Sequence, residues 1–393
     1  MAPSPPDFQI SPIEAIEDVL LYRIVAYLEF PDILRLSTSA PILRQYLRRE
    51  ILEHVCVYGN SHEILRRLGT FPAQQQWGRD ILEHIRKVRV ILTKDTTESR
   101  HDWDNICDFH PGGNILLPTP GDMHDALRIA LVHTLKSMFK MRYLDLCMAA
   151  LPKDEQANIS QSLEEFVELL YLRLLRVRGE FKLQSILLRL CSAPTLVALD
   201  LDTNHKSTLL KFATKKFPNL ARLRLMISCE REKPSRSTNH RVVEAIGALA
   251  PQLRWLILCE GPSKHYRRRL IGETMGERQQ FFNEIRLLGD TLKESMPKLR
   301  RFACTLWLER LSNGMMHGQY PADQEDHELA DWEPFLSTVA SKIQERANQL
   351  RDVCILIENG KYRSYEKQDS IRIMGVEDVH RTDNWPFGLA SVS

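Results

Sequence analysis

The feature that most constrains the fold is a six-residue phrase, apolar-x-x-apolar-x-apolar, that recurs seven times along the chain. The copies begin at Ile85, Met141, Leu196, Leu220, Leu253, Leu299 and Leu350. The end of the phrase alternates between apolar and variable residues, and this period of two is typical of a β-strand. Four of the copies have a proline two residues before their first leucine. We therefore expect each copy to be a short strand that follows a turn.

Segments with helical spacing of apolar residues precede most of these strands. They span residues 126–139, 183–190, 207–217, 242–249, 281–296 and 332–349. One helix and one strand per unit is the arrangement of leucine-rich repeats, in which each unit buries its apolar face against its neighbours. The interval of 24 residues from Leu196 to Leu220 lies within the regular range of about 20–29 residues, and the other intervals are longer. The prediction is an irregular array with polar loops inserted; the alternative is an α/β domain whose strands merely share the phrase.

The first 50 residues have a different pattern. Ser11, Pro12 and Glu14 read as a helix start, because serine caps a helix, proline suits its first turn and the glutamate completes a capping box. A break at 30–32 leaves Asp32 as the cap of a second helix, and a third begins near residue 42. Three short helices in about 40 residues are too small to be stable alone. This module therefore needs a partner or a following domain to cover its apolar surface.

This segment resembles the F-box. The family pattern is roughly Leu-Pro-x-Glu-Leu-Leu-x-x-Ile-hydrophobic-x-Tyr-Leu, followed after a short gap by Asp-Leu. The matching residues are Leu20, Leu21, Ile24, Tyr27, Leu28, Asp32 and Ile33. Residues 36–44 also resemble the closing helix region of the family, especially in its fungal members. Two positions depart from the pattern, since Ile16-Glu17 stands for the usual Leu-Pro and Val19 for the usual glutamate.

The resemblance implies a substrate-recognition adaptor of a cullin–RING (SCF-type) ubiquitin ligase. The F-box would bind a Skp-family linker protein, and through it a cullin, while the repeats would hold a target protein. The residues that the resemblance assigns to the linker contact are Ile16, Leu20, Leu21, Ile24, Leu28 and Ile33. The alternative is a protein-binding scaffold with no ligase link, whose N-terminal helices only cap the repeats; the departures at Glu17 and Val19 slightly favour it.

The predicted organisation is α/β, with a three-helix F-box-like module followed by an irregular leucine-rich-repeat-like solenoid. The predicted segments are a disordered N-terminus at 1–10, the module at 11–52, a helical linker at 53–84, the array at 85–360 and a C-terminal tail at 361–393.

Arginine dominates the variable positions of the strand phrase. It follows the first apolar residue in five of the seven copies. Because arginine offers bidentate contacts to carboxylate and phosphate, these positions predict a surface for an acidic or phosphorylated segment. The candidate target-binding residues are Arg142, Tyr143, Arg222, Arg224, Arg254, Trp255, Arg300 and Arg301. The alternative is that these charges only solvate the strands, and that Asp145, Asp200 and Asp352 neutralise part of them.

Composition and motifs exclude several other classes. A net charge of +2 does not suggest a nucleic-acid binder. No apolar run approaches the length of a membrane span, so we expect no membrane contact and a cytoplasmic or nuclear location. No phosphate loop, nucleophile elbow or zinc-binding helix motif is present, so we expect neither enzyme activity nor a cofactor or metal. His110 to Gly113 matches a haem-binding tetrapeptide, but its surroundings favour a simple turn.

Overall fold

The computed structural model has an α/β fold, as the sequence predicts, and divides into two compact units, residues 1–171 and 172–393. We describe each unit by itself. The structure describes residues 20, 24, 30–47, 53–73, 84–93, 123–165, 168–202, 208–227, 239–260, 274–306, 332–356, 362–366 and 371–372. The predicted linker contacts Ile16, Leu21 and Leu28 lie outside these residues, as does the segment 110–113.

In its described part, unit 1 contains helices α2 and α3 near the N-terminus and a set of parallel strands. Its elements are α2 (Phe30–Ser39), α3 (Pro41–Tyr46), β1 (His54–Gly59), α5 (Ser61–Ala73), β2 (Lys87–Leu92), α7 (Met123–Ser137), β3 (Tyr143–Cys147) and α8 (Lys153–Leu163). Strands β1, β2 and β3 pair in that order, all parallel. Ile33, Leu43 and Leu47 form a small buried cluster that holds α2 against α3.

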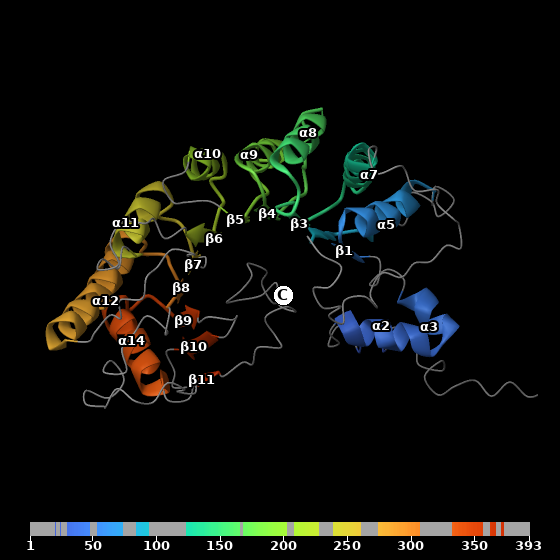
Figure 1. Cartoon of the computed structure of the whole chain (residues 1–393). Helices are drawn as coiled ribbons and strands as arrows, with labels where there is room; N and C mark the ends of the chain where they lie inside the picture. Colours follow the sequence, from blue (N-terminus) through green and yellow to red (C-terminus); the bar gives the residue numbers. More distant parts are fainter. Residues whose placement is uncertain are drawn as a thin grey trace, which may run out of the picture. The chain divides into compact units, whose positions relative to one another are not determined.

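Unit 2 repeats a strand–helix alternation. Its elements are β4 (Leu174–Arg178), α9 (Phe181–Leu190), β5 (Ala198–Leu201), α10 (Thr208–Lys216), β6 (Arg222–Ile227), α11 (Asn239–Leu249), β7 (Trp255–Glu260), α12 (Met275–Ser295), β8 (Arg301–Thr305), α14 (Glu333–Arg346), β9 (Asp352–Leu356), β10 (Tyr362–Glu366) and β11 (Ile371–Arg372). Strands β4 to β9 are parallel neighbours in chain order, and β10 and β11 continue the sheet antiparallel. Figure 1 shows the helices of this unit along one side of its strands.

All seven copies of the phrase become parallel strands, and the six predicted helices are present. Four further strands, β1, β4, β10 and β11, were not predicted. Strand β1 lies in the range 53–84, which was predicted as a helical linker and also contains helix α5. Strand β4 fits the phrase through Leu172, Leu175 and Val177, and the predicted tail contributes β10 and β11.

A shared turn joins helix to strand in successive strand–helix units, which are called repeats below. The backbone N–H of the first leucine of the phrase donates to the carbonyl three residues earlier, as from Leu220 to Phe217 and from Leu253 to Ala250. The next residue then donates to its counterpart in the preceding repeat, as from Arg254 N to the Ala221 carbonyl and from Arg300 N to the Arg254 carbonyl. Each repeat is therefore fixed at the same position relative to the one before it.

The core of unit 2 is made of the apolar positions of the phrase. Leu223 and Leu225 of β6 and Leu256 and Leu258 of β7 are almost completely buried, and their counterparts in the other repeats are buried as well. Burying one such side chain stabilises a fold by about 1.5–3 kcal/mol. Side chains between them point to the opposite face of the sheet, because successive residues of a strand alternate.

Glycines allow neighbouring helices of unit 2 to approach closely. A Cβ atom built on Gly289 of α12 would lie 2.7 Å from the Cβ of Arg346 and 3.1 Å from the Ile343 carbonyl of α14. On the same helix, Gly276 has open space, with only the Thr274 hydroxyl at 4.0 Å.

We therefore expect Gly289→Ala to lower the free energy of unfolding by about 1–3 kcal/mol, since the added methyl has no room. Gly276→Ala, on the same helix, is the matched control and should leave stability unchanged or raise it slightly. Urea unfolding followed by circular dichroism measures both. Equal stability of the two variants would contradict the close packing of α12 on α14.

Candidate functional site

The face of the unit 2 sheet opposite the buried leucines is rich in arginine. We call it the arginine face, and it carries Arg176, Arg178, Arg222, Arg224, Trp255 and Arg301, with Asp200 and Asp352 among them. The pairing register places all of these residues except Arg178 in two rows. The first row consists of Leu174, Ala198, Arg222, Trp255, Arg301 and Asp352, and the second of Arg176, Asp200, Arg224, Ile257, Ala303 and Cys354.

Asp200 of the second row contacts three arginines. Its Oδ2 accepts hydrogen bonds from Arg176 Nε at 2.7 Å and Arg224 Nη1 at 2.9 Å, and its Oδ1 forms an ion pair with Arg178 Nη1 at 2.7 Å. Burial opposes ionisation of this carboxyl, but the charges of Arg178, Arg224 and Arg176 outweigh it and hold the pKa of Asp200 well below its usual range. The carboxylate is therefore charged at neutral pH.

Arg224, a predicted target contact, belongs to this internal network. Burial alone would lower the pKa of its guanidinium, but the charge of Asp200 raises it. Its Nε also donates to Cys259 Sγ at 3.3 Å. The side chain is thus held by groups of its own sheet.

Trp255 lies between two arginines of the first row. The guanidinium carbons of Arg222 and Arg301 are 4.3 Å and 4.6 Å from the centre of its ring. Both distances are within the range of a cation–π contact. Arg301 Nε also forms an ion pair with Asp352 Oδ2 at 2.6 Å.

Positive charge gathers around Arg222. Its burial lowers the pKa of the guanidinium, and the nearby charges of Arg173, Arg301 and Arg254 lower it further. Arg254 and Arg173 are exposed and stand just before β7 and β4. Arg301 of this row is paired with Asp352.

The eight predicted target-binding residues fall into both units. Arg222, Arg224, Arg254, Trp255, Arg300 and Arg301 are in unit 2, whereas Arg142 and Tyr143 are in unit 1. Arg300 is exposed and its Nη1 donates to the Gln349 carbonyl at 3.0 Å. In unit 1 Arg142 is exposed, while Tyr143 is buried and its hydroxyl accepts from Arg89 Nη2 at 3.4 Å.

Arg173, Arg176 and Arg178 were missed from the sequence because the strand that carries them was missed. The signal was present, since Arg173 follows the first apolar residue of the phrase at Leu172.

The N-terminal module presents apolar side chains at its surface. Of the predicted linker contacts, Leu20 is 50% exposed and Ile24 is 44% exposed, whereas Ile33 is only 8% exposed and packs inside the module. On α3, Ile42 and Tyr46 are 38% and 40% exposed. Each pair is one helical turn apart in sequence.

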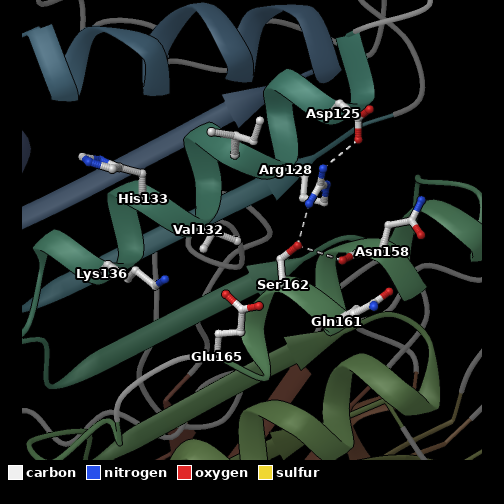
Figure 2. A pocket seen from close by; sticks show the side chains of 10 residues that line it. Asp125, Arg128, Val132, His133, Lys136, Asn158, Gln161, Ser162 and Glu165 are labelled. Carbon is white, nitrogen blue, oxygen red and sulfur yellow. Dashed lines mark hydrogen bonds and ion pairs between the residues drawn. The ribbon is translucent and has the colours of Figure 1, made fainter.

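A groove of about 610 Å³ lies between α7 and α8 of unit 1 (Figure 2). Arg128 spans it, donating to Asp125 Oδ1 at 2.9 Å and to Ser162 Oγ at 2.8 Å. Ser162 Oγ in turn donates to the Asn158 carbonyl at 3.2 Å. These polar groups bond to one another across the helix pair, so the groove is a weaker candidate than the arginine face.

Searches of protein-family models and of curated proteins found no match to this chain. Within the part of the chain that the structure describes, no cluster of histidine, cysteine, aspartate or glutamate has the geometry of a metal site. None of the described helices combines the length and hydropathy that crossing a membrane requires.

We expect Asp200→Asn to lower the free energy of unfolding by about 3–5 kcal/mol at pH 7, because three guanidiniums lose their buried carboxylate. The folded-state pKa is depressed, so this contribution is complete above the ordinary carboxyl pKa of about 3.9 and is lost as the pH falls from there towards the folded value. The difference in free energy of unfolding between wild type and variant should therefore become smaller below about pH 4.

Urea unfolding at neutral and acidic pH measures this difference in free energy of unfolding. Asp202→Asn, an exposed neighbour beyond the same strand, is the control and should not alter stability. An Asp200→Asn variant as stable as wild type at pH 7 would show that the carboxylate is not needed to hold the three arginines.

Proposed function

We propose that this chain is a non-catalytic adaptor of a cullin–RING ubiquitin ligase. Its N-terminal module would bind a Skp-family linker, and the arginine face would hold a target protein. Ubiquitin transfer would be catalysed elsewhere in the complex, and this chain would contribute by positioning the target and raising its local concentration. Such a role takes place in the cytoplasm or nucleus.

The exposed pair Leu20 and Ile24 is the observation that carries the linker contact. Large apolar side chains one turn apart on a helix are typical of a helix that binds a groove or another helix. Burying them against a partner would stabilise the complex by about 1.5–3 kcal/mol per side chain. Ile33 was also predicted to contact the linker. It packs against Leu43 and Leu47 and so holds the module together.

Ile42 and Tyr46 of α3 are a second pair of exposed apolar side chains in the same module. A tyrosine at an interface offers a large contact area together with a hydroxyl that remains hydrogen-bonded. The F-box resemblance at Leu20 to Ile33 supplies the identity of the partner, and the exposed side chains support a protein contact there.

The repeats support the second half of the proposal. The turn from helix to strand recurs with the same hydrogen bonds, and each repeat pairs in parallel with its predecessor. We infer from this recurrence that the strands and helices belong to a leucine-rich-repeat-like solenoid. In such an array the strand side is the surface that commonly receives a partner, and here that side is the arginine face.

We expect a Leu20→Asp, Ile24→Asp double variant to lose co-purification with a Skp-family linker, because two charges would be buried in an apolar contact. Wild type should retain the linker through gel filtration. A matched control carries Ile129→Asp and Leu287→Asp, which change apolar residues of α7 and α12 that are 61% and 45% exposed, and it should leave linker binding intact.

Circular dichroism checks that both double variants remain folded. If folded wild type does not bind the linker, the ligase link fails and the scaffold alternative takes its place. If the control variant also loses the linker, the contact is not specific to the module.

A further inference from the structure

We propose that the C-terminal segment, residues 373–393, covers an apolar patch on the strand side of unit 2 and competes with a target for that side. The inference rests on the proposed function, in which the strand side holds the target, and it adds a means of regulation. The apolar patch consists of Ile257 of β7, Ala303 of β8 and Cys354 of β9, which are neighbours in the second row. Residues 373–393 lie outside the part of the chain that the structure describes.

The strands that carry the patch are buried on both faces. Strand β6 alternates between buried and half-buried residues, as a sheet with one open face does. In β9, by contrast, every residue is buried. Ile257, Ala303 and Cys354 are each 0% exposed, although Figure 1 shows the helices of unit 2 on the other side of the strands. A second layer therefore lies over this part of the sheet.

Neighbouring side chains of the sheet do not supply this layer. Trp255 and Arg301 precede the patch on their strands and are long enough to shield one margin of it. At the other margin, two residues further along each strand, stand the shorter Cys259, Thr305 and Leu356. Cys259 and Leu356 are themselves only 8% and 5% exposed. Because short side chains at the margin of an open face keep contact with water, the cover comes from chain that lies above the sheet.

The composition of the C-terminal segment suits this cover. It contains Trp385, Pro386 and Phe387 in succession. A residue before proline favours an extended conformation, and in an extended chain alternate side chains point to the same side. Both aromatic rings can therefore contact the apolar patch together. The segment also has three acidic residues and one arginine, a charge balance that complements the arginines beside the patch.

The position of the segment in the sheet also favours it. It follows β11, which β10 joins to β9. Since neighbouring strands lie about 4.8 Å apart, Ile257 of β7 is about 19 Å from β11. The chain from Arg372 to Trp385 spans about 43 Å when extended, so the aromatic rings can reach the patch. The loops that follow β6, β7 and β8 instead lead to helices on the other side of the sheet.

Thiol labelling of the full chain tests the cover, because Cys354 belongs to the patch. N-ethylmaleimide is the reagent, and mass spectrometry of peptides measures the labelling rate of each cysteine. Cys304 faces the helices and Cys191 follows α9, and both thiols are buried. Labelling of these two cysteines therefore reports loss of the fold, whereas labelling of Cys354 alone reports release of the segment.

A Trp385→Ala, Phe387→Ala double variant should label Cys354 at least about tenfold faster than wild type while Cys191 and Cys304 stay protected, because two apolar contacts are lost. Each single variant should give an intermediate rate. A matched control carries Trp307→Ala and Leu311→Ala, which remove two apolar side chains between β8 and α14. This control should leave Cys354 protected.

A fluorescent peptide of residues 373–393 tests the competition, since it takes the place of a target on the strand side. Fluorescence anisotropy should show that it binds the double variant at least about tenfold more tightly than wild type, because the tethered segment of wild type competes at a high effective concentration. A peptide with both alanines should bind neither protein.

Protection of Cys354 in the folded double variant would overturn the proposal. Exposure of Cys354 in the Trp307→Ala, Leu311→Ala control alone would do so as well, because the loop before α14 would then be the cover. Equal binding of the peptide by wild type and double variant would show that the segment does not compete for the strand side. Linker binding is measured separately: a wild type that fails to bind the linker refutes the proposed function but leaves the labelling result in place.

Discussion

Unit 2 depends on one constraint, the in-register parallel pairing of successive strands. The residue after the first leucine of each phrase donates a backbone hydrogen bond to the same position of the phrase before it. Equivalent residues consequently form rows across the sheet. The leucines form rows that are buried against the helices, and the variable residues form rows on the opposite face.

This register concentrates arginine even though the chain as a whole is nearly neutral, with a net charge of +2. Aligned guanidiniums repel one another, and the fold offsets the repulsion in two ways. Asp200 lies within a triad of arginines at 2.7–2.9 Å, and Trp255 separates Arg222 from Arg301. Asp200 thus contacts three guanidiniums at once, and Asp352 pairs with Arg301 in the neighbouring row.

Periodicity predicted most of the fold. The seven phrases and six helical segments follow directly from the spacing of apolar residues, because burial on one face sets that spacing. Strand β4 was not predicted, because arginines flank Val177 and no proline precedes Leu172. Its three apolar positions nevertheless fit the phrase. The sequence also suggested that Asp145, Asp200 and Asp352 would pair with neighbouring arginines, and each does so.

The candidate site was harder to predict, because the sequence pattern does not show which acidic residue each arginine contacts. Arg224 and Arg222 occupy alternate positions of one strand, yet only Arg224 faces Asp200. Similarly, apolar spacing alone could not separate the buried Ile33 from the exposed Leu20 and Ile24. The assignment needs the tertiary packing of α2 on α3, which local propensity does not encode.

The central proposal is that the N-terminal module binds a linker protein through its exposed apolar side chains. Hydrogen–deuterium exchange of the full chain, with and without the linker, tests it most directly. The account predicts that the linker protects peptides containing Leu20, Ile24 and Ile42 and leaves those containing Arg222, Trp255 and Arg301 unchanged. Protection of the strand segments by the linker, or no protection of the N-terminal segment by it, would contradict the account.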